Sequence, residues 1–328
     1  MPRKALALAL AMSSVVVGCG TSASDGFPLY DVDEVRLPGP AVRFDYQDFD
    51  PAARRLMISH LAADEVLFVD VDRLDEISVV GDLPGVHGVR LAPDLGLAFA
   101  STSNNELATI DVESARVVRR STTGSFPDGV AYDQASGLVV VSNKDDGSVT
   151  VIAADTGDVV RTVAVGDEAG NSIDDPTTGH VFVASAGPES LVELDPATGT
   201  VVRRIALGGC EGAHGVYVTG DGALAFVACE RNATLVTVDL RTGDAVDDQP
   251  VGSVPDVLAY DPGLQRLYVA AESGDVAVFQ LEHGRLRSLG RRRLDPHAHS
   301  VAVDSKTHRV FLPLQDVDGH PVLRVMEP

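Results

Sequence analysis

The chain has 328 residues and a formal net charge of −22, with 48 acidic against 26 basic residues. A surface with this much negative charge repels nucleic-acid phosphates and anionic lipid headgroups. We therefore expect no nucleic acid among its partners. Hydrophobic residues make up 45% of the chain, which is enough for a large globular core. No phosphate-binding loop, dinucleotide-binding fingerprint or nucleophile-elbow motif is present, which argues against those enzyme classes.

The first 18 residues have the pattern of an export signal. Arg3 and Lys4 supply positive charge, and an apolar run of about 13 residues follows them. That run is shorter than the roughly 20 residues that a membrane-spanning helix needs. Removal of residues 1–18 would leave 24 basic against 48 acidic residues, a net charge of −24.

The signal ends in Val-Val-Gly-Cys at residues 16–19, which resembles the bacterial lipobox, where a small residue precedes the cysteine that becomes lipidated. The alternative is an ordinary signal peptide followed by an incidental cysteine. We expect an exported bacterial lipoprotein, held by acyl chains on Cys19 at the periplasmic or extracellular face of a cell membrane. Residues 19–33 begin with small, polar side chains and predict a flexible tether.

Residues 34–328 contain a repeat with a period of 41 to 44 residues. Each copy has an apolar stretch that ends in a turn, usually at an aspartate, followed by further β-rich stretches separated by turns such as Thr156-Gly157. Four short strands at this period are typical of a β-propeller blade. Seven equivalent anchor positions mark the copies: Tyr46, Gly88, Gly129, Asn171, Gly215, Val257 and Ser300. The sequence therefore predicts an all-β, seven-bladed propeller of four-stranded blades.

The two ends of the repeat region predict how the ring closes. The seventh copy ends after its third strand, at residues 322–326, and residues 34–37 offer the missing fourth strand. We expect this N-terminal strand to complete the last blade and to pair its free edge. The predicted organisation is a signal peptide at 1–18, a tether at 19–33 and a propeller at 34–328.

The segments Val139–Asn143 and Leu267–Ala271, with their aspartate leads and Thr-Gly turns, resemble the YVTN-repeat (YncE-like) propellers of bacterial envelopes. The resemblance covers residues 34–328. Segments such as Gly209–Gly215 look like an exported, uncharacterised subgroup of that family. The resemblance implies the propeller fold and an envelope location. Some relatives in the wider family bind nucleic acid, which the acidic charge here argues against.

Candidate site residues precede the anchors, because the loop that leads into each inner strand lies at one mouth of the central channel. In chain order these residues are Asp45, His87, Asp128, Gly170, His214, Asp256 and His299. The loop between the second and third strands opens on the same face and adds His60, Asn143 and Glu230.

Imidazole and carboxylate groups together bind divalent transition metals. If a metal is present, we expect the three histidines that precede anchors as ligands. The three aspartates would be ligands, orienting groups or a general base. The alternative is a polar channel filled with water, and no closely spaced zinc motif decides between the two interpretations.

Cys210 lies in the loop before the fifth inner strand, and Cys229 lies at the end of that blade's second strand. In an oxidising compartment we expect a disulfide between them. The alternative is a metal cluster formed by both cysteines and His214.

These features predict a monomeric, envelope-anchored module, rather than an enzyme, that binds a partner protein or small ligand through its acidic channel mouth. The alternative function is a metal-dependent enzyme, either a lactonase-like hydrolase or an oxidoreductase, built on the ring of histidines and aspartates. Lactonase propellers tend to use a Glu/Asn/Asp calcium set, and the histidines here depart from that pattern.

Overall fold

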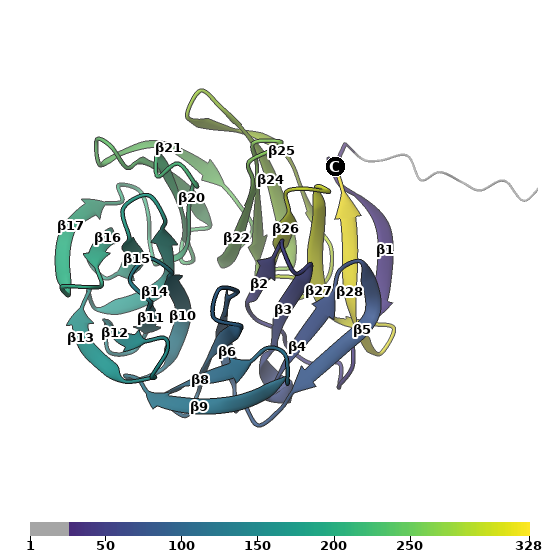
Figure 1. The fold of residues 1–328 in the computed structure, drawn as a ribbon. Coiled ribbons are helices and arrows are strands. Elements are labelled where there is room, and N and C mark those ends of the chain that lie inside the picture. Colours follow the sequence, from purple (N-terminus) through teal and green to yellow (C-terminus); the bar gives the residue numbers. More distant parts are fainter. Residues whose placement is uncertain (1–25) are drawn as a thin grey trace, which may run out of the picture.

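The computed structural model describes residues 26–328. It is a ring of seven four-stranded antiparallel sheets, which confirms the predicted seven-bladed β-propeller (Figure 1). The predicted signal peptide, Cys19 and the first part of the tether, residues 19–25, lie outside the described residues. Within residues 26–328, no helix is long and apolar enough to cross a membrane.

The strands of each blade follow one another in chain order from the axis outward, except in blade 7, whose outer strand is β1. Blades 1 and 2 consist of β2 (Gln47–Asp50), β3 (Arg55–His60), β4 (Glu65–Asp70), β5 (Arg73–Val80), β6 (Val86–Ala92), β7 (Leu97–Thr102), β8 (Glu106–Asp111) and β9 (Arg116–Thr122). Blades 3 and 4 consist of β10 (Pro127–Asp133), β11 (Leu138–Asn143), β12 (Ser148–Ala153), β13 (Val159–Ala164), β14 (Glu168–Asp175), β15 (His180–Ala186), β16 (Ser190–Asp195) and β17 (Thr200–Ala206).

The remaining blades complete the ring. Blades 5 and 6 consist of β18 (Ala213–Val218), β19 (Leu224–Cys229), β20 (Thr234–Asp239), β21 (Asp244–Pro250), β22 (Pro255–Asp261), β23 (Arg266–Ala271), β24 (Asp275–Glu282) and β25 (Arg285–Arg293). Blade 7 consists of β26 (Ala302–Asp304), β27 (Arg309–Val317), β28 (His320–Glu327) and β1 (Tyr30–Arg36), and a short 3-10 turn, η1 (Leu61–Ala63), follows β3.

The N-terminal strand closes blade 7, as the sequence predicts. Strand β1 pairs antiparallel with β28, so that Glu34 lies opposite Arg324 and Val35 opposite Leu323. The strand begins at Tyr30, four residues before the predicted start of the propeller. The extra length follows a buried apolar residue, Leu29, which belongs to the core.

The core lies between the blades, where sheets pack face to face. The second strand of a blade is buried on both faces, as in β11, whereas the outermost strand β13 alternates between exposed and half-buried side chains. This burial explains why the second strands read as continuous apolar runs, because both faces contact a neighbouring sheet. A ring packed in this way holds the inner strands rigidly around the axis.

The repeated aspartate after the inner strand caps the turn that follows. Asp133 is buried, and its two carboxylate oxygens accept hydrogen bonds from the backbone N–H groups of Ala135 and Ser136, both at 3.1 Å. In Asp261 one oxygen, Oδ1, accepts from both of the backbone N–H groups two and three residues later. The aspartates that recur after the inner strands therefore stabilise turns and do not mark a binding site.

The predicted disulfide between Cys210 and Cys229 is confirmed. It joins the segment before β18 to the end of β19, and both cysteines belong to the hydrophobic core between blades 4 and 5. Because the bridge uses both sulfur atoms, the alternative of a metal cluster built from these cysteines and His214 is wrong.

Replacing both cysteines, as Cys210→Ser with Cys229→Ser, should lower the free energy of unfolding by about 3 kcal/mol. The bridged residues are 19 positions apart. Cross-linking a loop of that length lowers the entropy of the unfolded chain, which stabilises the folded state by roughly 3 kcal/mol. Urea unfolding of the oxidised wild type and the variant measures the difference. Reduced wild type should behave like the variant, and equal stability of the variant and the oxidised wild type would contradict the prediction.

Candidate functional site

A β-bulge sits on the inner strand of blades 2 to 6, at the pair formed by each candidate site residue and its anchor. In blade 2, Val86 pairs with Thr102 and Val89 with Ala100, so two residues lie opposite one. The same shift occurs in β10, β14, β18 and β22. The sequence places these residues in loops before the strands, whereas in these five blades they lie within the strands. A bulge changes the direction of the side chains that it contains. In these blades the candidate site residues lie in the bulges, and their side chains point toward the axis.

Glycine at three of the seven anchors allows the inner strands to approach one another closely. A Cβ atom on Gly88 would lie 2.1 Å from the carbonyl oxygen of Asp128, and one on Gly215 would lie 2.0 Å from that of Asp256. A Cβ on Gly170 would lie 2.7 Å from the Cα of His214, which explains why one of the seven candidate positions has no side chain. Backbone packing between neighbouring blades therefore fixes the positions of the site residues.

The converging charged side chains form what we call the mouth cluster. Six of the seven blades, or the segments that lead into them, contribute. The members are Arg43, Asp45, His87, Asp128, Lys144, His214, Glu230, Asp256, Glu272 and His299.

Asp45 lies between two histidines on one side of the cluster. Its Oδ2 accepts a hydrogen bond from Nδ1 of His87 at 2.9 Å, and its Oδ1 lies 3.5 Å from Nε2 of His299. The same Nε2 atom lies 4.0 Å from Oδ2 of Asp256. Asp45, Asp256 and His299 are 3%, 5% and 1% exposed, so water screens their charges poorly.

His214 is surrounded by carboxylates on the other side of the cluster. Its Nε2 lies 3.4 Å from Oδ1 of Asp256, 3.5 Å from Oε1 of Glu230 and 3.6 Å from Oδ2 of Asp128. Nζ of Lys144 lies 3.9 Å from the same Glu230 oxygen.

Burial and neighbouring charges oppose each other in setting the pKa values of this cluster. Burial and the Lys144 charge disfavour the charged form of His214, but its acidic neighbours outweigh both and raise its pKa to about 9. Burial likewise disfavours the charged form of His299, but Asp45 and Asp256 raise its pKa to about 9. Burial favours the neutral form of Asp45, yet the adjacent histidines hold its pKa well below its usual range. Protons on the histidines therefore balance the carboxylates when no other cation is present.

Two of the residues predicted from the second-to-third-strand loops have partners outside the mouth cluster. Nδ1 of His60 lies 2.9 Å from Oε1 of Glu65. Oδ1 of Asn143 accepts a hydrogen bond from the backbone N–H of Gly124 at 2.9 Å, within blade 3 and its leading loop. The third, Glu230, joins the cluster through His214.

Several members of the cluster were not predicted from the sequence. Lys144 and Glu272 occupy the position equivalent to Glu230, directly after the second strand of their blades. Sequence reasoning selected Asn143, one residue before Lys144, and a shift of one residue in a strand turns a side chain to the opposite face. Aligning the ends of the second strands would have found both residues. Arg43 precedes the first inner strand and has no counterpart in the repeat.

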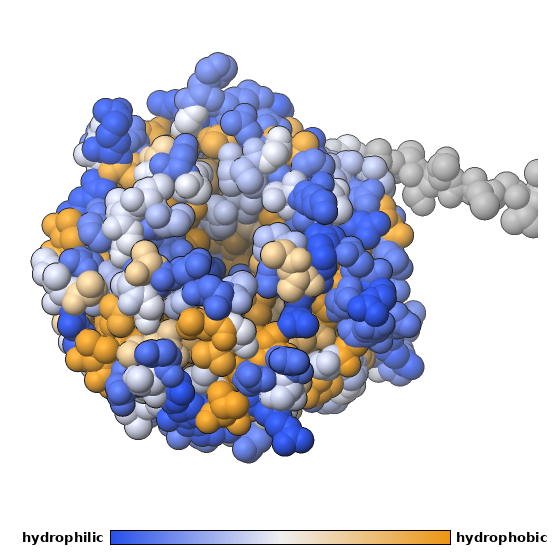
Figure 2. All heavy atoms as spheres, in the orientation of Figure 1, coloured by the Kyte–Doolittle hydropathy of each residue, from blue (hydrophilic) through white to orange (hydrophobic). Residues whose placement is uncertain are grey.

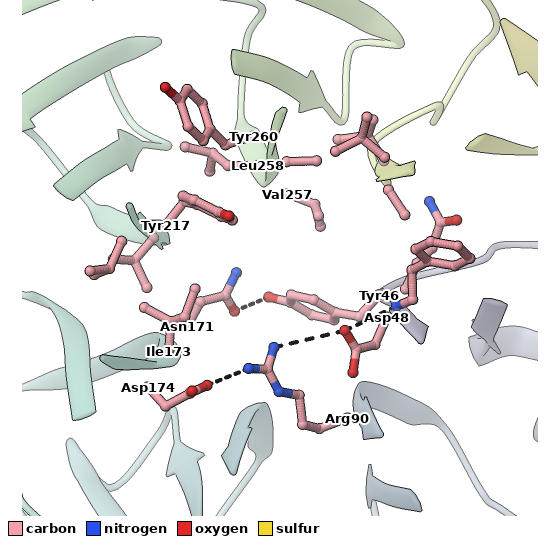
Figure 3. Close-up of a pocket in the computed structure, with 18 of the residues that line it drawn as sticks. Tyr46, Asp48, Arg90, Asn171, Ile173, Asp174, Tyr217, Val257, Leu258 and Tyr260 are labelled. Carbon is pink, nitrogen blue, oxygen red and sulfur yellow. Dashed lines mark hydrogen bonds and ion pairs between the residues drawn. The ribbon is translucent and has the colours of Figure 1, made fainter. Parts of the chain in front are cut away.

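The side chain of Tyr46 extends across the channel and lines the cavity beyond the mouth cluster (Figure 3). Its hydroxyl donates a hydrogen bond to Oδ1 of Asn171 and lies 3.3 Å from both Nε2 of His214 and Oδ1 of Asp256. The hydroxyl thus connects the cavity wall to the charged mouth.

The cavity beyond Tyr46 has a volume of about 420 Å³ and runs toward the turns at the far ends of the inner strands. Arg90 crosses part of it and pairs with Asp174, with Asp48 3.8 Å away (Figure 3). Tyr217 and apolar side chains such as Leu258 form other parts of its wall. Figure 2 shows the ring hollowed at its centre on the face in view.

The Tyr46→Phe variant should lower the free energy of unfolding by about 1–2 kcal/mol, because it leaves the buried Oδ1 of Asn171 without its donor. Urea unfolding measures the loss. Tyr217→Phe is the matched control, since the Tyr217 hydroxyl makes no hydrogen bond within residues 26–328 and that variant should retain wild-type stability. Equal stability of both variants would refute the role of the Tyr46 hydroxyl.

Comparison with known proteins identifies the fold and no family. No family model matches the sequence, and no curated protein matches it. Among solved structures 1829 chains match, so the fold is a common one. A chain of a mitotic checkpoint complex aligns over 100% of this chain and 99% of its own length, with a TM-score of 0.78 and 11% identity. Likeness at that identity shows the propeller fold alone, and the resemblance to YVTN-repeat propellers stays a prediction.

Proposed function

We propose that this chain is an exported, lipid-anchored propeller of the YVTN-repeat type that binds a cationic ligand at the mouth cluster and does not transform it. Export and anchoring are supported by the basic N-terminus, the apolar run of about 13 residues and the lipobox-like sequence before Cys19. Ligand binding is supported by the charges that converge at the axis.

The observation that carries the proposal is a set of carboxylates at the mouth that permanent positive charges do not balance. Five carboxylates meet there with only two permanently positive side chains, Arg43 and Lys144, so three are balanced only by protons on the histidines, which a cation can replace. The five are Asp45, Asp128, Glu230, Asp256 and Glu272. Because buried charges are costly unless they are paired, a site of this composition favours a cation.

The same cluster also offers a way in from solvent. The side chains of Glu230 and Lys144 are 25% and 27% exposed, whereas Asp128 and Asp256 behind them are nearly buried. A cation would meet the exposed carboxylate first and the buried ones next. Such a gradient attracts a charged ligand and then removes it from water, which strengthens each contact.

Calorimetric titration of the purified protein with Ca²⁺, Mn²⁺, Zn²⁺ and a linear diamine should show binding of at least one of them at one site per chain. The Asp128→Asn variant removes one of the buried charges without a large change of shape, so it should weaken that binding about 10-fold.

The exposed residue Asp155 provides the matched control, and Asp155→Asn should bind like the wild type. If no cation in the panel binds at millimolar concentration, or if the two variants lose affinity equally, the proposed cation site is wrong.

The Cys19→Ala variant tests the lipid anchor. It should move the protein from the membrane fraction to the soluble fraction, because no helix within residues 26–328 would hold the propeller in a bilayer. Its thermal unfolding should equal that of the wild type, since Cys19 lies outside the propeller. Fractionation of cells expressing each form is the measurement, and a variant that stays with the membrane would count against lipidation.

A further inference from the structure

We propose that a divalent first-row transition metal ion binds at the axis, held by Nε2 of His299 and by one carboxylate oxygen each from Asp45 and Asp256. This inference rests on the proposed capture of a cation and names the chemical class of that cation. The structural evidence for the metal ion is the orientation of the three side chains.

The imidazole of His299 is held with one nitrogen free. Its Nδ1 lies 2.8 Å from the backbone carbonyl oxygen of His297. A carbonyl oxygen only accepts hydrogen bonds, so Nδ1 must donate. Nε2 is buried and has no hydrogen-bond partner within residues 26–328. Histidines that bind metals usually donate the other ring N–H to a carbonyl or carboxylate in this way.

Each aspartate also has one oxygen held by the protein and one turned toward His299. In Asp45, Oδ2 accepts from His87 while Oδ1 lies 3.5 Å from Nε2 of His299. In Asp256, Oδ1 lies 3.3 Å from the Tyr46 hydroxyl while Oδ2 lies 4.0 Å from the same nitrogen. The three atoms that lack short protein contacts thus face one another.

The separations suit a small metal ion. Two ligand atoms of a tetrahedral zinc site, each about 2.1 Å from the metal, are about 3.4 Å apart. The distances of 3.5 Å and 4.0 Å from His299 are close to that value, and ligand atoms of the three residues lie within 4.8 Å of one another. Small rotations of two carboxylates would close the remaining gap.

Asp45, His87 and Asp128 form a second group whose ligand atoms also lie within 4.8 Å of one another. Its histidine already uses both nitrogens, because Nδ1 donates to Asp45 and Nε2 lies 3.4 Å from Oγ of Ser103. We therefore assign the ion to the first group, and His87 becomes a residue that positions Asp45.

The ligand atoms favour a transition metal over calcium or magnesium. Calcium takes six to eight oxygen ligands, and magnesium keeps several waters around an oxygen-only site. One imidazole with two carboxylates is typical of ions from manganese to zinc. A dication would also neutralise the two buried aspartates that bind it.

The test is a titration of Co²⁺ into the chelator-treated, dialysed full-length protein, purified without a polyhistidine tag. We expect one Co²⁺ per chain, a visible absorption band that reports a nitrogen ligand, and displacement of the band by Zn²⁺. His299→Ala should reduce the affinity for Co²⁺ by about 100-fold or more. His320→Ala is the matched control, because that histidine is exposed on β28 and its loss should change nothing.

Asp256→Asn keeps the shape of the side chain and should also weaken Co²⁺ binding. It provides the test if His299→Ala fails to fold. Co²⁺ binding that is unchanged in either folded variant would overturn the ligand assignment. Should Ca²⁺ or the diamine bind while Co²⁺, Mn²⁺ and Zn²⁺ do not, the metal inference fails and cation capture stands. Absence of binding by every cation would overturn both.

Discussion

The close approach of the inner strands around the axis is the constraint on which the site depends. Gly88 and Gly215 have no room for a Cβ against the backbone of the next blade. At the same level the strands bulge, and the residue before each anchor joins its counterparts from other blades. At the three glycine anchors this packing leaves no room for a side chain, and the residue before each of them contributes its side chain to the mouth cluster.

Ring closure extends this constraint to the last blade. His299 precedes the shortest inner strand, β26, and that blade depends on β1 for its outer edge. The Arg54 guanidinium in blade 1 also binds the Asp304 carboxylate of blade 7 at 2.6 Å. Contacts between blades 1 and 7 and within blade 7 therefore hold the segment that carries His299. A ring left open at this seam would not fix His299 against Asp45, because the two belong to the first and last blades.

The repeat period sufficed to predict the number of blades and the strand that closes the ring, because both depend on patterns that recur along the chain. It also placed Cys210 and Cys229 on one face of one blade, where an oxidising compartment predicts a disulfide. It also selected Asp45, Asp128 and the histidines that meet at the mouth. The period could not predict the bulges, which depend on pairing between strands. The period does contain the signal for Lys144 and Glu272, because each lies 15 residues after its anchor, as Glu230 does, but the sequence analysis selected Asn143 instead of its neighbour Lys144. Contacts such as that of Tyr46 with Asn171 join distant blades and leave no local signal.

Burial of several carboxylates is costly, and propellers do not need it in order to fold. The apolar faces between the blades already supply the core, and the repeated aspartates such as Asp133 stabilise turns with both oxygens satisfied. In the mouth cluster, by contrast, Asp45 and Asp256 each direct one oxygen toward a histidine nitrogen that has no hydrogen-bond partner within residues 26–328. This difference in hydrogen bonding separates the aspartates that stabilise turns from those of the proposed binding site. It depends on the three-dimensional arrangement and cannot be read from composition.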